Sequence, residues 1–367
     1  MQSKFRVIDS GVVEGRLNIA IGQAIVEAHQ AGSVPDTLRF LRFPPTALVG
    51  RHQALAQEID LDYCRQNDIG VARRITGGGA IFLDPGQLGW ELAFSRSTLR
   101  IASLAELARE ICEAVANGIS RLGVEASYRP RNDIEVGGRK ISGTGGFFDG
   151  DTLFYQGTVL VDMNPQVMMS ALRVPKAKLE KRNLDSAEQR VVTLRELLGE
   201  DSPDLPQIQQ ALVASFSERF GLQMETGELS SEEHKQALRL YREEIGNDEF
   251  VSEIEEPPAA RGDLAGRHQS PGGTIRSYIR LEGPAQNRIR AALITGDFFI
   301  TPPRIIFDLE ASLRGVYIEH LDEAVKNFFE VAQVEALSVS ADDFIASIRN
   351  ALSGNLSGQD QPGRDEA

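Results

Sequence analysis

Two arginines stand directly before a run of three glycines in this chain. Residues 73–82 read Arg-Arg-Ile-Thr-Gly-Gly-Gly-Ala-Ile-Phe. Glycine lets the main chain come close enough for its N–H groups to contact a ligand, and paired guanidinium groups donate to carboxylate or phosphate oxygens. The segment therefore indicates a site for an anionic, phosphate-bearing ligand. It matches neither a P-loop nor a dinucleotide motif. The alternative interpretation is a tight turn between strands, flanked by solvated arginines.

A second segment, residues 131–145, combines a lysine with a glycine turn. It predicts a β-hairpin whose turn is Val-Gly-Gly-Arg at 136–139, because glycine accepts the positive φ angles of two-residue hairpin turns. Such a hairpin brings Asn132 and Asp133 on one arm close to Lys140 on the other. The three side chains could then face one ligand. The alternative is a lysine that is merely exposed on a hairpin arm.

Together with Gln-Gly-Thr-Val-Leu at 156–160, these segments resemble the motifs of the lipoate–protein ligase family, within the wider biotin and lipoate transferase superfamily. The resemblance covers roughly residues 5 to 200. One departure is Gln156, where many relatives carry histidine. The resemblance implies an enzyme that activates lipoate with ATP, holds the lipoyl adenylate, and transfers the lipoyl group to a lysine of a lipoyl carrier domain.

The resemblance also implies roles for individual residues. Lys140 would be the catalytic cation between the acyl carboxyl and the α-phosphate, and Asp133 would hold Lys140 or a Mg²⁺ ion. His52 and Gln53 would line the acyl pocket. The residues expected to contact ATP or the lipoyl adenylate are Arg74, Thr76, Gly77, Gly78, Gly79, Ala80, Ile81, Phe82, Asn132, Asp133, Lys140, Ser142, Gly143, Gly157 and Thr158.

Two other functions stay open. Related octanoyl and lipoyl transferases use a cysteine nucleophile, and this chain has two cysteines, Cys64 and Cys112. Neither has a histidine nearby in the sequence to serve as a base. Cys112 falls on the apolar side of a predicted helix, so we expect it to be structural. The second hypothesis is an acyltransferase working between carrier proteins, and the third is a non-catalytic relative that only binds lipoyl domains.

The apolar pattern predicts an α+β protein with a mixed, mostly antiparallel sheet flanked by helices, rather than a doubly wound sheet. We expect a catalytic domain of the biotin and lipoate ligase type at 1–250 and a linker rich in proline and glycine at 251–273. A smaller α+β accessory domain is expected at 274–353. There, Gly-Asp-Phe-Phe at 296–299 is similar to the accessory domain of two-domain lipoate ligases. A polar tail at 354–367 is expected to be disordered.

The charge balance excludes some partners. The chain has 39 lysines and arginines against 53 aspartates and glutamates, a net charge of −14, which disfavours nucleic acid. Without a bilayer-length apolar stretch or a signal peptide, we expect a cytoplasmic protein with no membrane contact. A lipoyl carrier domain that is itself acidic would need a basic docking surface, although such charges also form ordinary solvated faces. The candidates are Arg129, Arg131, Arg139, Lys176, Lys178, Lys181 and Arg182.

Overall fold

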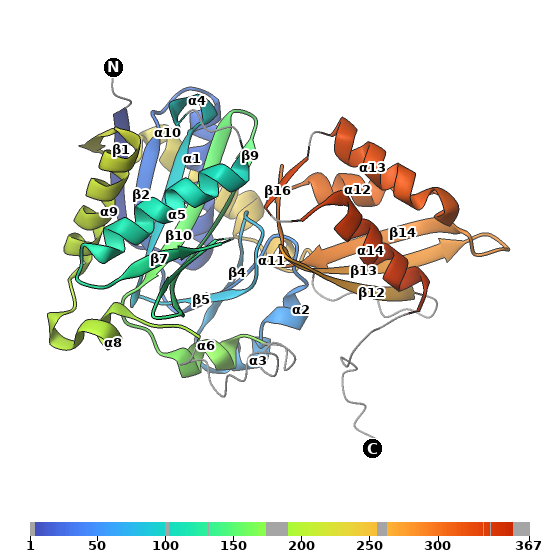
Figure 1. Ribbon diagram of the computed structural model, residues 1–367, viewed down its shortest axis with the longest axis horizontal. Coiled ribbons are helices and arrows are strands. Elements are labelled where there is room, and N and C mark those ends of the chain that lie inside the picture. Colours follow the sequence, from blue (N-terminus) through green and yellow to red (C-terminus); the bar gives the residue numbers. More distant parts are fainter. Residues whose placement is uncertain are drawn as a thin grey trace.

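A computed structural model describes residues 4–99, 103–130, 132–173, 190–254, 263–332, 334–337 and 339–354 of the 367-residue chain. The larger, N-terminal part contains an eight-stranded sheet between helices. The smaller, C-terminal part, orange and red in Figure 1, packs against one side of the larger part. The two parts are hydrogen-bonded to each other, since the main-chain N–H of Phe148 donates to the hydroxyl of Thr301 at 2.9 Å.

The main sheet is mixed and mostly antiparallel, which confirms the predicted α+β class. Its strands are β1 (Lys4–Val12), β2 (Thr37–Arg42), β6 (Gln87–Ser95), β7 (Ala126–Arg129), β8 (Asp133–Val136), β9 (Arg139–Asp149), β10 (Thr152–Leu160) and β11 (Gln223–Thr226). They lie in the order β11-β1-β2-β6-β10-β9-β8-β7. Strand β1 runs parallel to β2 and to β11, and the other neighbours are antiparallel.

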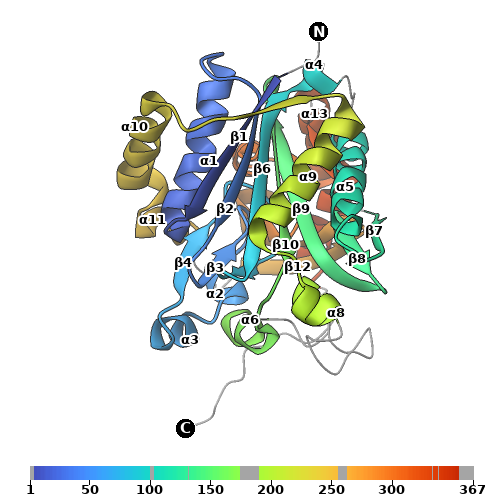
Figure 2. The ribbon, with the colours of Figure 1, turned by 90° about the vertical axis from the view of Figure 1, so that its left-hand side faces the viewer.

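Helices cover both faces of this sheet (Figure 2). Helices α1 (Gly15–Gln30) and α10 (Ser231–Leu240) lie on one face, and α5 (Leu104–Ser120) and α9 (Leu205–Phe220) lie on the other. Helix α5 buries Leu107, Ile111, Val115 and Ile119, which recur every four residues along one side. The hydrophobic core therefore consists of two layers, one between the sheet and each pair of helices.

Shorter helices connect these elements. They are α2 (Leu55–Glu58), α3 (Leu61–Gln66), α4 (Arg96–Leu99), α6 (Pro165–Ala171), α8 (Leu194–Leu198) and α11 (Asp248–Val251), with 3₁₀ turns at Gly199–Asp201 and Ile318–His320 and a π turn at Tyr241–Ile245. None of the helices in the described part of the chain is long and apolar enough to cross a membrane.

A separate three-stranded sheet positions the glycine-rich segment. Strand β3 (Thr46–Val49) lies between β4 (Gly70–Arg73), to which it is parallel, and β5 (Ile81–Leu83), to which it is antiparallel. Since parallel strands end at the same edge, the loop after β3 and the loop after β4 meet. A Cβ on Gly50 would lie 1.9 Å from the carbonyl oxygen of Gly78, so only glycine allows this approach.

The C-terminal part is a smaller α+β domain. A three-stranded antiparallel sheet, β12 (Asp263–Ser270), β13 (Gly273–Glu282) and β14 (Arg288–Gly296), is covered by α12 (Ile305–Ser312), α13 (Leu321–Val331) and α14 (Ala341–Leu352), while β15 (Phe299–Thr301) pairs with β16 (Glu335–Leu337). Helix α14 begins with a capping box, since Ser340 and Asp343 each satisfy the other's main-chain N–H.

The predicted linker is wrong over part of its length. We expected an irregular segment at 251–273, but Asp263–Ser270 is strand β12. Its sequence looks like a loop because Gly266 interrupts it. That glycine is where α14 touches the sheet, since a Cβ there would lie 2.1 Å from the main-chain nitrogen of Ala351. Residues 255–262 of the linker and 355–367 of the expected tail lie outside the described residues.

Candidate active site

The β8–β9 hairpin holds Lys140 against Asp133, as predicted. Gly137 and Gly138 have φ of 58° and 78°, the conformation that a two-residue hairpin turn needs. The ammonium Nζ of Lys140 lies 2.7 Å from Oδ1 of Asp133. The Lys140 side chain is 36% exposed, so it is neither buried nor simply solvated.

A register shift in the hairpin positions the Lys140 side chain over Gly143. The register shifts between Ile134 and Glu135, so β9 carries one extra residue at this point, as in a β-bulge. A Cβ on Gly143 would lie 2.5 Å from Nζ of Lys140, which shows that the ammonium lies directly over this glycine. The main chain of Lys140 is also fixed from the other side, because its N–H donates to the carbonyl of Arg190 at 2.9 Å.

Asp133 lies between two cations. It forms ion pairs with Lys140 and with Arg129. Burial by itself would raise the pKa of Asp133, but the two cations outweigh it and lower the pKa. The carboxylate is therefore ionised and keeps Lys140 in position.

The two arginines before the glycines do different things. Arg73 is 1% exposed and donates to main-chain carbonyls of Gly50, Arg51, Gln53, Phe250, Val251 and Ile254. It ties the glycine segment to its surroundings. Arg74 is also buried, and one of its nitrogens donates to the carbonyls of Gly77 and Gly79 at 3.0 and 2.8 Å. Neither arginine is solvated, so the alternative of a turn with solvated arginines is wrong.

Arg74 and Ser142 each carry a buried polar atom that the described residues leave without a hydrogen-bond partner. The buried Nε of Arg74 finds no hydrogen-bond partner within the described part of the chain, and burial lowers the pKa of Arg74 to about 10. The hydroxyl of Ser142 is likewise buried and unpartnered among the described residues. Buried polar groups normally have partners, so both atoms are candidates for ligand contact.

Other predicted contacts surround this place. Thr76 is buried and accepts a hydrogen bond from the side-chain amide of Gln156 at 2.9 Å. Asn132 is fixed by the main chain of Thr144, which donates to the carbonyl of Asn132 at 2.8 Å. Ala80 and Thr158 are partly exposed. The Gln156–Thr76 hydrogen bond thus joins the glycine segment to β10, where Gln156 pairs with Gly145 of β9.

Three predicted residues face elsewhere. Phe82 is 3% exposed and packs in the core beneath the small sheet, while Ile81 packs against the core on the α1 side. A Cβ on Gly157 would meet the ring of Trp90 at 2.3 Å, so the open side of this glycine is filled by protein. If these residues contact a ligand in this arrangement, they do so through their main chains.

His52 and Gln53 are buried, not open to a pocket. The ring of His52 is 1% exposed and stacks on Phe298 of the C-terminal domain, with centroids 5.2 Å apart. Burial, assisted by Arg51 and Arg73, lowers the pKa of His52 to about 3, so the ring is neutral. The side-chain oxygen of Gln53 accepts the N–H of Gly50 at 2.9 Å. Both residues shape the loop after β3.

The C-terminal domain touches the glycine segment directly. The N–H of Gly78 donates to the carbonyl of Phe298 at 3.1 Å, and the N–H of Gly296 donates to the carbonyl of His52 at 2.9 Å. A Cβ on Gly77 would lie 2.2 Å from the carbonyl oxygen of Phe298. The main chain of the C-terminal domain, at Phe298, therefore takes the close position that Gly77 and Gly78 leave open.

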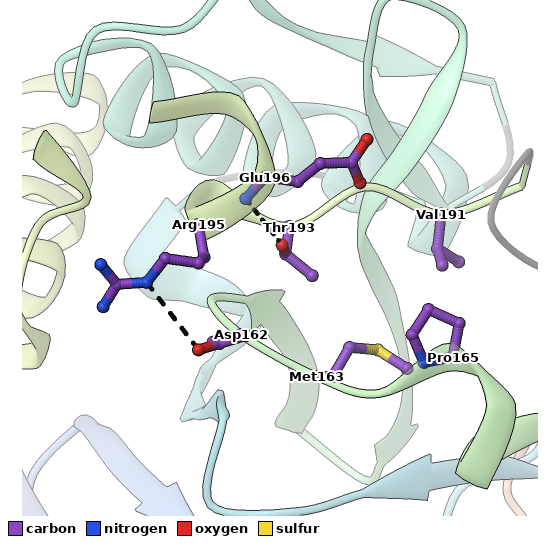
Figure 3. Close-up of a pocket in the computed structure, with 7 residues that line it drawn as sticks. All are labelled: Asp162, Met163, Pro165, Val191, Thr193, Arg195 and Glu196. Carbon is purple, nitrogen blue, oxygen red and sulfur yellow. Dashed lines mark hydrogen bonds and ion pairs between the residues drawn. The ribbon is translucent and has the colours of Figure 1, made fainter. Parts of the chain in front are cut away.

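A pocket of about 380 Å³ opens beside the hairpin (Figure 3). Its lining residues are Asp162, Met163, Pro165, Val191, Thr193, Arg195 and Glu196. It adjoins the lysine, because Val191 forms a β-bridge with Lys140. None of these residues was among the predicted contacts. The available signal was the segment at 190–194, which also resembles the family motifs but contains no glycine cluster or central cation.

The cysteines do not meet the requirements of a nucleophile. Cys64 and Cys112 are 1% and 0% exposed, and burial raises the pKa of each thiol to about 11. The sulfur of Cys112 lies 3.2 Å from the hydroxyl of Thr144. Thr144 neighbours Gly143 on β9, and successive side chains point to opposite faces, so Cys112 lies across the sheet from Lys140.

The larger part of the chain is thus an α+β domain in which the Lys140 hairpin is joined to a mixed sheet with a glycine-rich segment beside it. Residues 14–217 match the family model of the lipoyl protein ligase A/B catalytic domain, and the chain belongs to this family. Because the match covers more than half of the chain, the Lys140 hairpin and the glycine segment are parts of a lipoate ligase or transferase domain.

Relatives differ in how much of the chain they cover. An octanoyltransferase LipM of Symbiobacterium thermophilum is 30% identical over 276 residues, which are 68% of this chain and 98% of that protein. Lipoate–protein ligase 1 of Staphylococcus aureus is 24% identical over 332 residues, 88% of this chain and 93% of that protein. The structure of LipL1 of P. falciparum in complex with lipoate shares the fold, with 17% identity and a TM-score of 0.72, and covers 94% of this chain and 99% of that one.

Proposed function

We propose that this protein is an ATP-dependent lipoate–protein ligase. It would activate lipoate with ATP to lipoyl-AMP, releasing pyrophosphate, and then pass the lipoyl group to a lysine of a lipoyl carrier domain, releasing AMP. The observation that carries the proposal is the contact of the C-terminal domain with the glycine segment. There, the Phe298 carbonyl accepts a hydrogen bond from the N–H of Gly78. A transferase that starts from an acyl carrier needs no adenylation module. The similarity to the S. aureus ligase extends over most of both chains, whereas LipM corresponds to about two thirds of this one.

Lys140 would serve both half-reactions. When a carboxylate attacks a triphosphate, negative charge builds up at the reacting oxygens, and a fixed cation stabilises it. Asp133 keeps the ammonium fixed, and the partial exposure of Lys140 leaves it accessible. In the second step the same ammonium would polarise the acyl carbonyl for attack by the acceptor lysine. Arg74 Nε and the Ser142 hydroxyl would offer further donors.

Asp133 and the other described residues around Lys140 do not by themselves form a metal site. Asp133, the predicted Mg²⁺ ligand, is engaged by two cations, and the described residues contain no cluster of three potential metal ligands. We therefore assign no reaction step to a protein-bound metal. In proteins Mg²⁺ is commonly held largely by substrate phosphates, so we include it with ATP in the assay.

An octanoyltransferase is the second candidate, favoured by the similarity to LipM. Against it, both cysteines are buried, burial raises the pKa of each thiol to about 11, and Cys112 lies across the sheet from Lys140. For carrier docking, Arg139 forms an ion pair with Glu196 and Arg129 with Asp133, so these two are not simply available to an acidic partner. The other five basic candidates lie outside the described residues.

The deciding test is the mass of an apo lipoyl domain after incubation with the protein. One reaction contains lipoate, ATP and Mg²⁺, and the other contains an octanoylated carrier protein without ATP. We expect one lipoyl group to be added in the first reaction only. Modification in the second reaction alone would make the protein a transferase.

A further inference from the structure

An aromatic side chain of the C-terminal domain fills a space beside Lys140. A Cβ on Gly145 would lie 2.1 Å from Cε1 of Phe299, and a Cβ on Gly78 would lie 2.5 Å from Cζ of the same ring. Both distances are far shorter than a carbon–carbon contact at van der Waals separation. The ring therefore lies directly on the main chain of β9 on one side and of the glycine segment on the other.

The ring and the ammonium share one face of β9. Gly143, which lies under the Lys140 ammonium, and Gly145, which lies under the Phe299 ring, are two residues apart. Residues two apart on a strand point to the same face and are separated by about 7 Å. Gln156 pairs with Gly145 from β10 and reaches Thr76 on the same side. The Phe299 ring thus lies between β9 and the glycine segment, where the sequence predicts ligand contacts at Gly143 and Gly78.

The floor beneath the ring suits an apolar ligand that ends in a carboxylate. Gly143 and Gly145 have no side chains, so an apolar group can lie flat on the strand, with its charged end at Lys140. In this structure that place is taken by a Phe299 ring, which is itself apolar. Its position is fixed by the Gly78–Phe298 hydrogen bond and by the contact of Thr301 with Phe148.

We propose that Phe299 occupies the acyl position of the active site, so that an incoming carboxylic acid must displace the ring in order to bind. This inference rests on the proposed function and assigns an affinity-determining residue to the C-terminal domain. The acid and the Phe299 ring compete for the same space over Gly145, and in the observed arrangement the ring occupies it.

The first test is binding of octanoate and of lipoate without ATP, measured by calorimetry. Phe299→Ala removes the competitor, and we expect both acids to bind about tenfold more tightly than to the unchanged protein. Phe328→Ala is the matched control, since Phe328 is a partly buried phenylalanine on α13 that packs against the core of the same domain. It is expected to bind as the unchanged protein does. Equal or weaker binding to folded Phe299→Ala would overturn the proposal.

A cross-link provides a second test. A Cβ on Gly79 would lie 3.7 Å from Cβ of Asp297, which is within the range of roughly 3.5–4.5 Å found across disulfides. In Gly79→Cys with Asp297→Cys, oxidation would hold Phe299 in place. We expect the oxidised form to bind octanoate at least tenfold more weakly than the reduced form of the same variant. Equal binding by the two forms would contradict displacement of the ring.

Adding Phe299→Ala to the cross-linked variant separates the ring from the rest of the domain. If the ring is the obstacle, the oxidised triple variant binds octanoate again. If the oxidised triple variant still fails to bind octanoate, the cross-linked domain and not Phe299 excludes the acid, and the proposal is wrong. Failure of the proposed function looks different. In that case no form, including Phe299→Ala, would bind either acid.

Discussion

Lys140 and Asp133 form an ion pair although they are not opposite each other in the hairpin. The register partner of Lys140 is Glu135, and the partner of Asp133 is Gly143. The lysine side chain therefore runs along the strand and reaches its carboxylate over Gly143, where a Cβ would lie 2.5 Å from Nζ. The position of the ammonium depends on both the bulge and the glycine.

Lys140→Ala tests whether this ammonium is the central cation. Removing one fixed donor from a developing anion typically lowers kcat by about 10²–10³ or more. We expect a loss of that size in carrier lipoylation, followed by mass spectrometry, with little change in thermal stability because the side chain is partly exposed. Lys235→Ala, an exposed lysine on α10, is the control. Near-normal turnover by Lys140→Ala would refute the role.

The cysteines can be removed to separate ligase from transferase. Both thiols are protonated near neutral pH, since burial raises each pKa to about 11. We expect Cys64→Ala with Cys112→Ala to keep turnover within a few-fold, at a cost of about 1 kcal/mol in stability for each lost buried contact. Turnover and chemical denaturation are to be measured on the same sample. Loss of activity in a variant that remains folded would return attention to covalent transfer.

The sequence predicted the elements that carry the site better than it predicted the contacts. The Gly137–Gly138 turn and the proximity of Lys140 to Asp133 are local, because they depend on turn chemistry within one hairpin. The capping box at Ser340 is local too. Such features can be predicted from residues that are close in the chain.

What could not be predicted depends on distant contacts. Gly77 and Gly78 were expected to approach a phosphate, but in this structure they approach Phe298 and Phe299 from more than two hundred residues away. His52 was expected to line the acyl pocket, but its ring is buried under Phe298. Strand β12 looked like a linker because its glycine makes room for a helix that follows much later. No local pattern encodes these pairings.

Arg73→Lys tests the structural role of the first arginine. Its guanidinium donates to six residues' carbonyl groups around the loop after β3 and the end of α11. A lysine offers a single nitrogen, so several of these buried carbonyls would lose their donors, each at a cost of about 1 kcal/mol or more. We expect the free energy of unfolding to fall by about 3 kcal/mol in urea denaturation. Arg65→Lys, on the surface of α3, should change it little. An equal effect of both would show that Arg73 does not organise the loops.

Glu310 on α12 should make stability depend on pH. Burial raises its pKa to about 7; the Ile294 N–H opposes this shift and Glu253 adds to it. A folded-state pKa above the unfolded value of 4.5 means that the folded state binds more protons between pH 4.5 and 7, so this carboxyl lowers stability as pH rises through that window. The full effect is at most about 3 kcal/mol.

Glu310→Gln keeps an acceptor for Ile294 and cannot ionise, so we expect it to be more stable than the unchanged protein at pH 8 and similar at pH 4.5. Urea denaturation at the two pH values measures the difference, with Glu323→Gln as an exposed control. If Glu310→Gln is no more stable than the unchanged protein at pH 8, then ionisation of Glu310 does not destabilise the folded state.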